Sequence, residues 1–190
     1  MPQPTHLWKL DIPSSEPTEE DLKKYWAKCV EKLGMVPNVI RAVSTNPKKA
    51  RAFISMYNEL MLGESGLSKL EREMIAVVVS SANRCYYCLV AHGQAVRQYS
   101  GDAQLGEMMV MNYRVAELPA RQRAMLDFAW KLTLTPFDVG DADREALRKL
   151  GFSERDLYDL CDVVAFFNMS NRMAHGTEMM PNADYHAQSR

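Results

Sequence analysis

The sequence predicts an all-α protein, because capped segments of helical character account for nearly all of residues 18–175. Proline, glycine and capping residues divide this stretch at intervals typical of helix lengths in globular domains. Residues 76–80 contain three valines, so this run could also be read as a strand. A capping box precedes the run and no partner strand is evident, so we interpret it as part of a helix.

An extended arm followed by three helices is expected in the N-terminal part of the chain. Residues 1–17 are rich in proline and show little periodicity, which predicts the arm. The first helix begins after Thr18, where acidic residues favour a helix N-terminus, and Gly34 ends it. A short helix over residues 38–43 and a longer one over residues 47–62, which begins at a proline, complete this part.

The middle of the chain predicts two consecutive helices with an interruption between them. A capping box at Ser68 opens a strongly apolar helix over residues 69–82. The pair Asn83-Arg84 interrupts it, and the next helix, over residues 85–99, carries two cysteines. Four more helices are expected over residues 102–112, 119–134, 141–150 and 153–175, with Pro136 and Gly151 separating the last three.

Two short motifs of the first half recur in the second half. We interpret residues 18–190 as one helical domain, with a catalytic unit over about 66–100 and a degenerate second copy, without cysteines, over about 151–176. Chance similarity is the alternative interpretation. The matching tripeptides are Gly-Leu-Ser at 66–68 with Gly-Phe-Ser at 151–153, and Ala-His-Gly at 91–93 with the same tripeptide at 174–176.

The composition excludes several classes of function. Hydrophobic residues make up 47% of the chain and charged residues 25%, which is ordinary for a globular protein. A formal net charge of −1 supports neither nucleic-acid binding nor electrostatic attachment to a membrane. Residues 1–17 lack the apolar core of a signal peptide, and no apolar run could span a bilayer. We therefore expect a cytoplasmic protein with reduced cysteines, and its methionine-rich helices predict a homo-oligomer.

Residues 85–92 and an upstream glutamate form the most informative cluster of the sequence. Cys85 and Cys88 are two residues apart, so one helical turn brings the sulfurs within bonding reach and lets the pair cycle between dithiol and disulfide. His92 follows one turn later, and at about 100° per residue the three side chains share one stripe of a helix. Glu73 lies on the preceding helix, where it could face His92 and set its tautomer and basicity.

The reactive form of such a cysteine is the thiolate. The interruption at Asn83-Arg84 places Cys85 in the first turn of its helix, where unpaired N–H groups, the helix dipole and the Arg84 cation stabilise a thiolate. His92 can take or return the proton of Cys88. The first-turn position favours Cys85 as the attacking residue, whereas adjacency to His92 favours Cys88. We favour Cys88 as the attacking thiol and Cys85 as the resolving thiol.

The pattern of Glu73, Cys85, Cys88 and His92 resembles the AhpD-like superfamily, which includes alkyl hydroperoxidases and carboxymuconolactone decarboxylases. The chain length and the stretch over residues 166–172 resemble its branch of peroxidase-related proteins. The resemblance implies an all-helical fold with an internal pseudo-repeat, assembled as trimers or hexamers. It also implies a peroxide-reducing cysteine pair supported by the glutamate and the histidine.

This sequence departs from the alkyl hydroperoxidase pattern at one position. Those enzymes carry a second histidine just before the second cysteine, and Tyr87 stands there in this chain. A tyrosine can donate a hydrogen bond but shuttles protons poorly near neutrality, because its usual pKa is about 10. The decarboxylase branch generally lacks the cysteine pair, so decarboxylase activity is not expected.

The leading functional hypothesis is a thiol-dependent peroxidase that needs no cofactor or metal. A hydroperoxide oxidises one cysteine to a sulfenic acid, the second cysteine condenses with it, and an external dithiol or a carrier protein reduces the disulfide. The main alternative is a dithiol–disulfide oxidoreductase or redox adaptor that serves another protein. A third is a zinc-stabilised oligomeric scaffold with Cys85, Cys88 and His92 as ligands and Glu73 or a water as the fourth. Cys29 and Cys161 are expected to be plain core thiols, and His175 a helix-capping residue.

Overall fold

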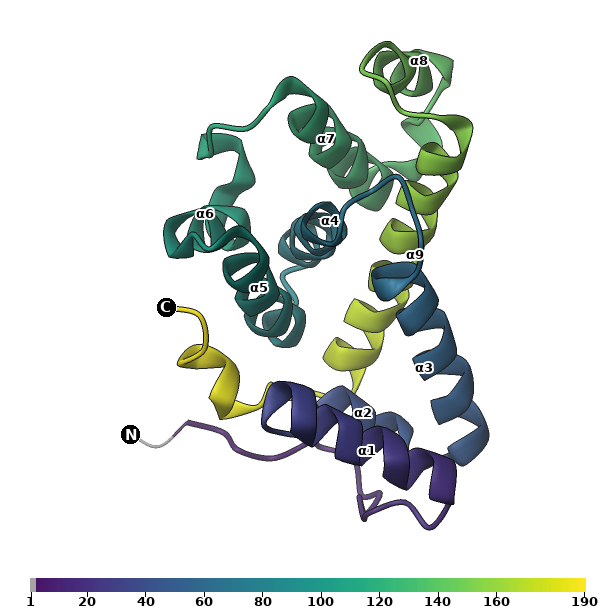
Figure 1. The fold of residues 1–190 in the computed structure, drawn as a ribbon, viewed down its shortest axis with the longest axis vertical. Coiled ribbons are helices and arrows are strands. Elements are labelled where there is room, and N and C mark those ends of the chain that lie inside the picture. Colours follow the sequence, from purple (N-terminus) through teal and green to yellow (C-terminus); the bar gives the residue numbers. More distant parts are fainter. Residues whose placement is uncertain (1–2) are drawn as a thin grey trace.

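The computed structural model describes residues 3–190, and this part of the chain contains nine α-helices, three short 3₁₀ helices and no strand (Figure 1). The predicted all-α fold is therefore confirmed, and each expected helix is present to within two residues of its predicted bounds. The α-helices are α1 (Glu20–Leu33), α2 (Asn38–Val43), α3 (Pro47–Leu62), α4 (Lys69–Ala82), α5 (Tyr86–Ser100), α6 (Ala103–Asn112), α7 (Ala120–Leu134), α8 (Asp141–Lys149) and α9 (Glu154–Gly176).

Helix α4 forms the centre of the main bundle (Figure 1). It packs against α5 and α6 on one side and against α7 and α9 on the other. Its residues 71–80 are all buried, and the side chains of residues 74–79 are fully inaccessible to solvent. A helix enclosed on every side has no polar face, so its valine-rich sequence loses the usual helical periodicity. This burial explains why the run resembles a strand in the sequence.

Helices α4 and α9, which begin at the repeated Gly-x-Ser motif, start in the same way. In α4 the Glu71 backbone N–H donates to the Ser68 hydroxyl at 3.2 Å, and the Ser68 N–H donates to the Glu71 carboxylate at 2.9 Å. In α9 Ser153 and Asp156 make the same two bonds, at 3.1 and 2.8 Å respectively. The two helices also contact each other. The matching motifs therefore mark the first turns of two helices that share one core.

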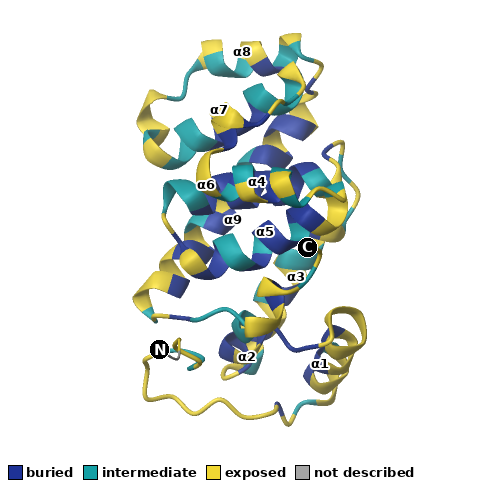
Figure 2. Ribbon diagram, turned by 90° about the vertical axis from the view of Figure 1, so that its left-hand side faces the viewer, coloured by how far each residue is buried: buried dark blue, intermediate teal, exposed yellow. Residues whose placement is uncertain are grey.

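Helices α1, α2 and α3 build a smaller apolar unit at one end of the molecule (Figure 2). Leu22, Trp26 and Ile40 are buried in its core, and the Trp26 indole donates a hydrogen bond to the Ser44 hydroxyl at 3.1 Å. Helix α3 runs from this unit to the main bundle, where it contacts α4 and α9. The space enclosed between the small unit and helices α4, α5 and α9 becomes the cavity of the candidate site.

The two ends of the chain are tied together beside the small unit (Figure 1). Residues 3–19 precede the first helix, and the Lys9 backbone N–H donates to the Thr177 carbonyl at 2.9 Å. Residues 1 and 2 of the expected arm lie outside the described residues. The C-terminal segment ends in a 3₁₀ helix, η3 (Ala183–His186), and buries Tyr185. The sequence predicted no structural role for this segment.

None of the helices over residues 3–190 combines the length and the hydropathy that a membrane crossing requires.

The contact between Gly66 and α9 gives a first test of the fold. A Cβ at Gly66 would lie 1.9 Å from a carboxylate oxygen of Asp156, which the α9 capping box holds in place. Gly66→Ala should therefore lower the free energy of unfolding by about 1–3 kcal/mol, the usual cost of overpacking. Thermal and denaturant unfolding followed by circular dichroism measures this change.

The control is Gly176→Ala at the end of α9, where an added Cβ meets no atom within 4 Å. This variant should be as stable as the natural protein or slightly more stable, because alanine is the better helix former. Equal losses of stability in the two variants would contradict the proposed role of the Gly66 contact.

Candidate active site

The chain reverses sharply between α4 and α5, and this reversal determines the position of both cysteines. Arg84 adopts the left-handed conformation with φ of 54°. The Cys85 backbone N–H then donates to the Ser80 carbonyl at 2.9 Å, which closes the turn. Cys85 was expected in the first turn of its helix, but it is the N-cap residue, and Cys88 occupies the first turn. The left-handed residue explains the difference, because the helix can begin only after the chain has turned.

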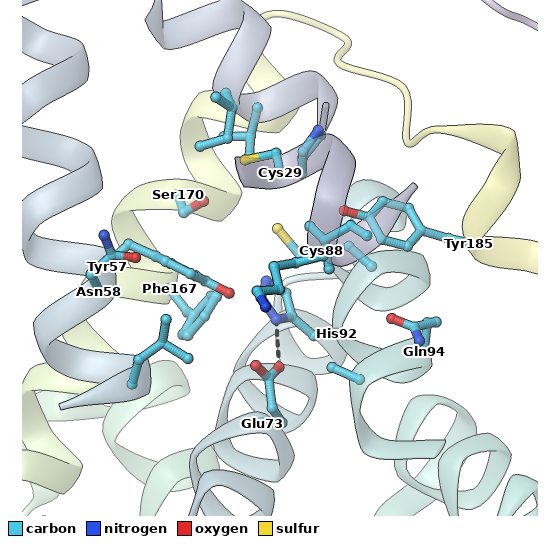
Figure 3. A pocket seen from close by; sticks show the side chains of 18 of the residues that line it. Cys29, Tyr57, Asn58, Glu73, Cys88, His92, Gln94, Phe167, Ser170 and Tyr185 are labelled. Carbon is cyan, nitrogen blue, oxygen red and sulfur yellow. Dashed lines mark hydrogen bonds and ion pairs between the residues drawn. The ribbon is translucent and has the colours of Figure 1, made fainter. Parts of the chain in front are cut away.

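Helix α5 runs back along α4 and brings Glu73 against His92. The Nδ1 atom of His92 lies 2.6 Å from Oε2 of Glu73, and both side chains are largely buried. A carboxylate only accepts hydrogen bonds, so Nδ1 carries the proton and Nε2 is free to accept another. The Phe167 ring packs edge-on against the imidazole, with centroids 4.6 Å apart, and restrains its rotation. Figure 3 shows the second ring nitrogen of His92 turned toward Cys88.

The two thiols are reduced, buried and electrostatically coupled. The Cys88 thiol donates a hydrogen bond to Cys85, and this bond is the largest cause that lowers the pKa of Cys85 to about 7. The Cys88 backbone N–H and the charges of His175 and His92 lower it further, against the effect of burial. The same hydrogen bond, followed by burial, raises the pKa of Cys88 well above its usual range. The pair therefore holds one negative charge and one shared proton near neutral pH.

A buried amide network from α9 supports the cysteine turn. Asn171 is fully buried and donates from Nδ2 to the Ser80 hydroxyl at 3.0 Å. Its Oδ1 accepts from the Asn83 amide at 3.0 Å, and its backbone carbonyl accepts from the Cys85 thiol at 3.9 Å. His175 Nε2 lies 2.9 Å from the Asn83 carbonyl, so it caps α4 rather than its own helix. The second half of the chain thus fixes the turn that carries the thiols.

A cavity of about 540 Å³ opens onto this cluster (Figure 3). Cys88, His92 and Glu73 contribute to its lining, whereas Cys85 lies behind them and does not. Apolar and aromatic groups make up much of the wall, as in most sites for small organic molecules. The aromatic residues include Tyr25, Phe53, Tyr57, Tyr99, Phe166 and Phe167.

Three further residues of the lining make contacts that the sequence did not predict. Cys29, expected to be a plain core thiol, lines the same cavity as Cys88, and burial raises its pKa (Figure 3). Tyr87 accepts a hydrogen bond from the Val39 N–H at 2.9 Å, so its hydroxyl ties α5 to α2. Tyr185 reaches the cavity from the C-terminal segment. Nothing in the local sequence around Cys29 and Tyr185 indicated that they would reach the site of the cysteine pair.

The residues proposed as zinc ligands do not form a ligand set. Among residues 3–190, no three histidine, cysteine, aspartate or glutamate side chains are grouped so that they could hold a metal ion. Glu73 instead interacts with a nitrogen of His92. The geometry therefore gives no support to the zinc-stabilised scaffold.

Known proteins share both the sequence and the fold of this chain. Residues 47–129 match the carboxymuconolactone decarboxylase family. A crystal structure of an uncharacterized peroxidase-related protein from Silicibacter sp. TM1040 is 61% identical over 100% of both chains, with a TM-score of 0.96. A peroxidase-related protein from Ralstonia eutropha JMP134, described as an alkylhydroperoxidase AhpD core, is 39% identical over 98% of both chains, with a TM-score of 0.93.

A more distant structure shares the fold alone. The debrominase Bmp8 is 20% identical over 88% of this chain and 89% of its own, with a TM-score of 0.75. Comparison with curated proteins gives no match.

The coupling of the two thiols can be tested by alkylation at different pH values. In the natural protein the alkylation rate of the pair Cys85 and Cys88 should rise with pH and reach half its maximum near pH 7, the pKa of the Cys85 thiol. Cys88→Ala removes the donor that stabilises the Cys85 thiolate, so the midpoint should move up toward about 8.5. Mass spectrometry of the peptide that contains Cys85 separates its reaction from those of Cys29 and Cys161.

Cys88→Ser is the matched variant, because its hydroxyl still offers a donor. Its midpoint should lie between those of the natural protein and Cys88→Ala. The hydrogen-bond explanation would be wrong if the alanine and serine variants kept the midpoint of the natural protein.

Proposed function

The chain belongs to the superfamily of AhpD-like proteins and carboxymuconolactone decarboxylases, and we propose that it is a thiol-dependent peroxidase that reduces organic hydroperoxides. One observation carries the proposal. Cys88 lines an apolar cavity next to a buried Glu73–His92 pair, and a second thiol is hydrogen-bonded behind it. A nucleophile, a base with its orienting carboxylate and a resolving thiol are the groups that such a reaction requires.

The first step is the loss of one proton from the thiol pair. His92 accepts this proton at Nε2, and Glu73 stabilises the resulting imidazolium through Nδ1. The remaining proton is shared between the sulfurs, and its transfer from Cys88 to Cys85 places the negative charge on the sulfur that faces the cavity. The accessible thiolate is then that of Cys88.

In the second step the sulfur of Cys88 is oxidised by two electrons and the hydroperoxide is reduced. The Cys88 thiolate attacks the terminal oxygen of the hydroperoxide, an S–O bond forms, the O–O bond breaks, and an alkoxide leaves. The alkoxide takes the proton from the His92 imidazolium and becomes the alcohol. The Cys85 thiol then displaces water from the sulfenic acid, which gives the disulfide, and an external dithiol restores the two thiols.

The cavity determines which substrates suit this chemistry. A volume of about 540 Å³ is far larger than hydrogen peroxide needs, and the apolar wall suits an organic group. Cys85 and Cys88 are each about 1% exposed, so a folded protein disulfide cannot reach their sulfurs directly. This burial favours the peroxidase over the dithiol–disulfide oxidoreductase, and it requires a reductant slender enough to enter the cavity.

Self-association, as a trimer or a hexamer, stays a prediction. Large apolar side chains on the surface support it: Met111 is 81% exposed and Phe137 is 82% exposed. Side chains of this kind are common at subunit contacts.

The first test of the proposed function is the pattern of oxidation in the cysteine variants. Reduced protein treated with cumene hydroperoxide should lose two hydrogens in the peptide that contains Cys85 and Cys88. Cys85→Ser should accumulate a sulfenic acid on Cys88 that a dimedone probe traps, because the resolving thiol is missing. Cys88→Ser should consume peroxide far more slowly, because its remaining thiol does not face the cavity. A disulfide to Cys29 or Cys161 in the natural protein, or sulfenic acid at Cys85 alone, would refute this assignment.

The second test concerns the proton relay. Glu73→Gln and His92→Asn should raise the apparent pKa of the thiol pair, because the charge of His92 lowers the pKa of Cys85. Peroxide turnover near pH 7 should fall by roughly 10²- to 10⁴-fold, the usual loss when general acid–base catalysis is removed. The double variant should be only slightly worse than the singles, because the two residues act as one unit. Unchanged pH profiles in both single variants would leave them as structural residues.

A further inference from the structure

We propose that the hydroxyl of Tyr57 binds the hydroperoxide and stabilises the alkoxide that leaves when Cys88 attacks. The inference rests on the proposed peroxidase function and adds to it a substrate-binding group from α3. Two observations support it: the position of the Tyr57 ring beside the relay, and the absence of a protein partner for its hydroxyl. The chemical argument is that the leaving oxygen needs a hydrogen-bond donor.

The Tyr57 ring belongs to a row of aromatic contacts that ends at the relay. Its centroid lies 6.1 Å from that of Phe166, which in turn lies 5.5 Å from Phe167. Phe167 packs against His92 at 4.6 Å. Figure 3 shows Tyr57 extending from α3 into the cavity, with its hydroxyl directed toward the imidazole of His92. These contacts fix the side chains of Tyr57 and His92 on one wall of the cavity.

The Tyr57 hydroxyl has no hydrogen-bond partner among residues 3–190, although it faces the reactive groups. Other tyrosine hydroxyls of the protein are engaged: Tyr25 donates to Asn58 at 3.4 Å, and Tyr113 donates to Asp127 at 2.7 Å. Tyr57 is only partly buried and its hydroxyl is not enclosed by protein, so it can donate to a partner bound in the cavity. At this position, a bound substrate oxygen would provide one.

Tyr57 is suited to donate a hydrogen bond rather than to ionise. Burial, and next the charge of Glu73, raise the pKa of Tyr57 well above its usual range. The hydroxyl therefore keeps its proton throughout the working pH range. When the O–O bond breaks, negative charge develops on the oxygen that carries the organic group, and a fixed donor at that oxygen stabilises it. The proton that finally neutralises the alkoxide comes from the His92 imidazolium.

Tyr57 is a better candidate than the two other tyrosines near Cys88. The Tyr87 hydroxyl accepts a hydrogen bond from the Val39 backbone N–H, which holds it at the contact between α5 and α2. Tyr185 enters the cavity from the side opposite to Tyr57, away from the Glu73–His92 pair (Figure 3). The leaving oxygen must be near the imidazolium that protonates it, so the donor on the His92 side is the one that can act on it.

Stopped-flow oxidation of the reduced Tyr57→Phe protein tests the inference, with hydrogen peroxide and cumene hydroperoxide as oxidants. The second-order rate constants for both should fall by roughly 10²-fold, the usual loss of one donor to a developing oxyanion. The pH profile of iodoacetamide alkylation should stay unchanged, because alkylation needs the thiolate but no oxyanion donor. Tyr158→Phe removes an exposed hydroxyl from α9, outside the cavity lining, and should match the natural protein in both assays.

Four outcomes would overturn the inference. These are oxidation of Tyr57→Phe at the rate of the natural protein, a defect limited to cumene hydroperoxide, an altered alkylation profile, and a larger loss in Tyr185→Phe than in Tyr57→Phe. A defect limited to the bulky substrate would mean that the ring only shapes the cavity.

The failure of the inference can be distinguished from that of the proposed function. If the natural protein reacts with neither peroxide, the peroxidase proposal fails and the role of Tyr57 fails with it. If the natural protein reacts and Tyr57→Phe reacts equally fast, only the role of Tyr57 fails.

Discussion

The reversal of the chain between α4 and α5 places each reactive group of the candidate site. Glu73 and His92 are nineteen residues apart, so an unbroken helix with a rise of 1.5 Å per residue would separate them by about 28 Å. The left-handed conformation of Arg84, which costs a non-glycine residue about 1 kcal/mol or more, lets α5 fold back and reduces the separation to a direct contact. The same turn ends just before Cys85, so the cysteine pair begins where the helix begins. The strained backbone of Arg84 and the cluster of reactive side chains both result from this turn between α4 and α5.

Burial and reactivity would conflict at this site if each thiol ionised alone. A single charge in an apolar cavity is costly, and an isolated buried cysteine has a raised pKa, as Cys29 shows. The pair avoids this cost because one sulfur donates to the other, so one charge is distributed over two neighbouring atoms. The buried Glu73–His92 contact then supplies a proton acceptor that is oriented before substrate arrives. A site that keeps water away from an organic hydroperoxide can in this way still hold a thiolate near pH 7.

The fold and the reactive residues could be predicted from the sequence because their signals are local. Capping residues, prolines and glycines indicated each helix, and the interruption at Asn83-Arg84 predicted two consecutive helices, with Glu73 on the first and the cysteines on the second. The predicted start of the cysteine helix at Cys85 was wrong by one residue, since no sequence pattern indicates a left-handed arginine. Tyr57 and Tyr185 were missed because they reach the cavity from distant elements. Their approach depends on how the small N-terminal unit and the C-terminal segment pack, and no periodicity encodes this.

The second half of the chain carries no reactive thiol at the position that corresponds to the cysteine turn, yet it determines how that turn behaves. Helix α9 is continuous over the stretch that corresponds to the turn between α4 and α5 in the first half, and its residues pack against that turn. Asn171 binds side chains of the turn, Phe167 restrains His92, and the charge of His175 lowers the pKa of Cys85. If the halves arose by duplication, one copy kept the chemistry and the other became its support. The reactivity of the cysteine pair is then a property of the contact between α4, α5 and α9, and it cannot be assigned to the Cys-x-x-Cys segment alone.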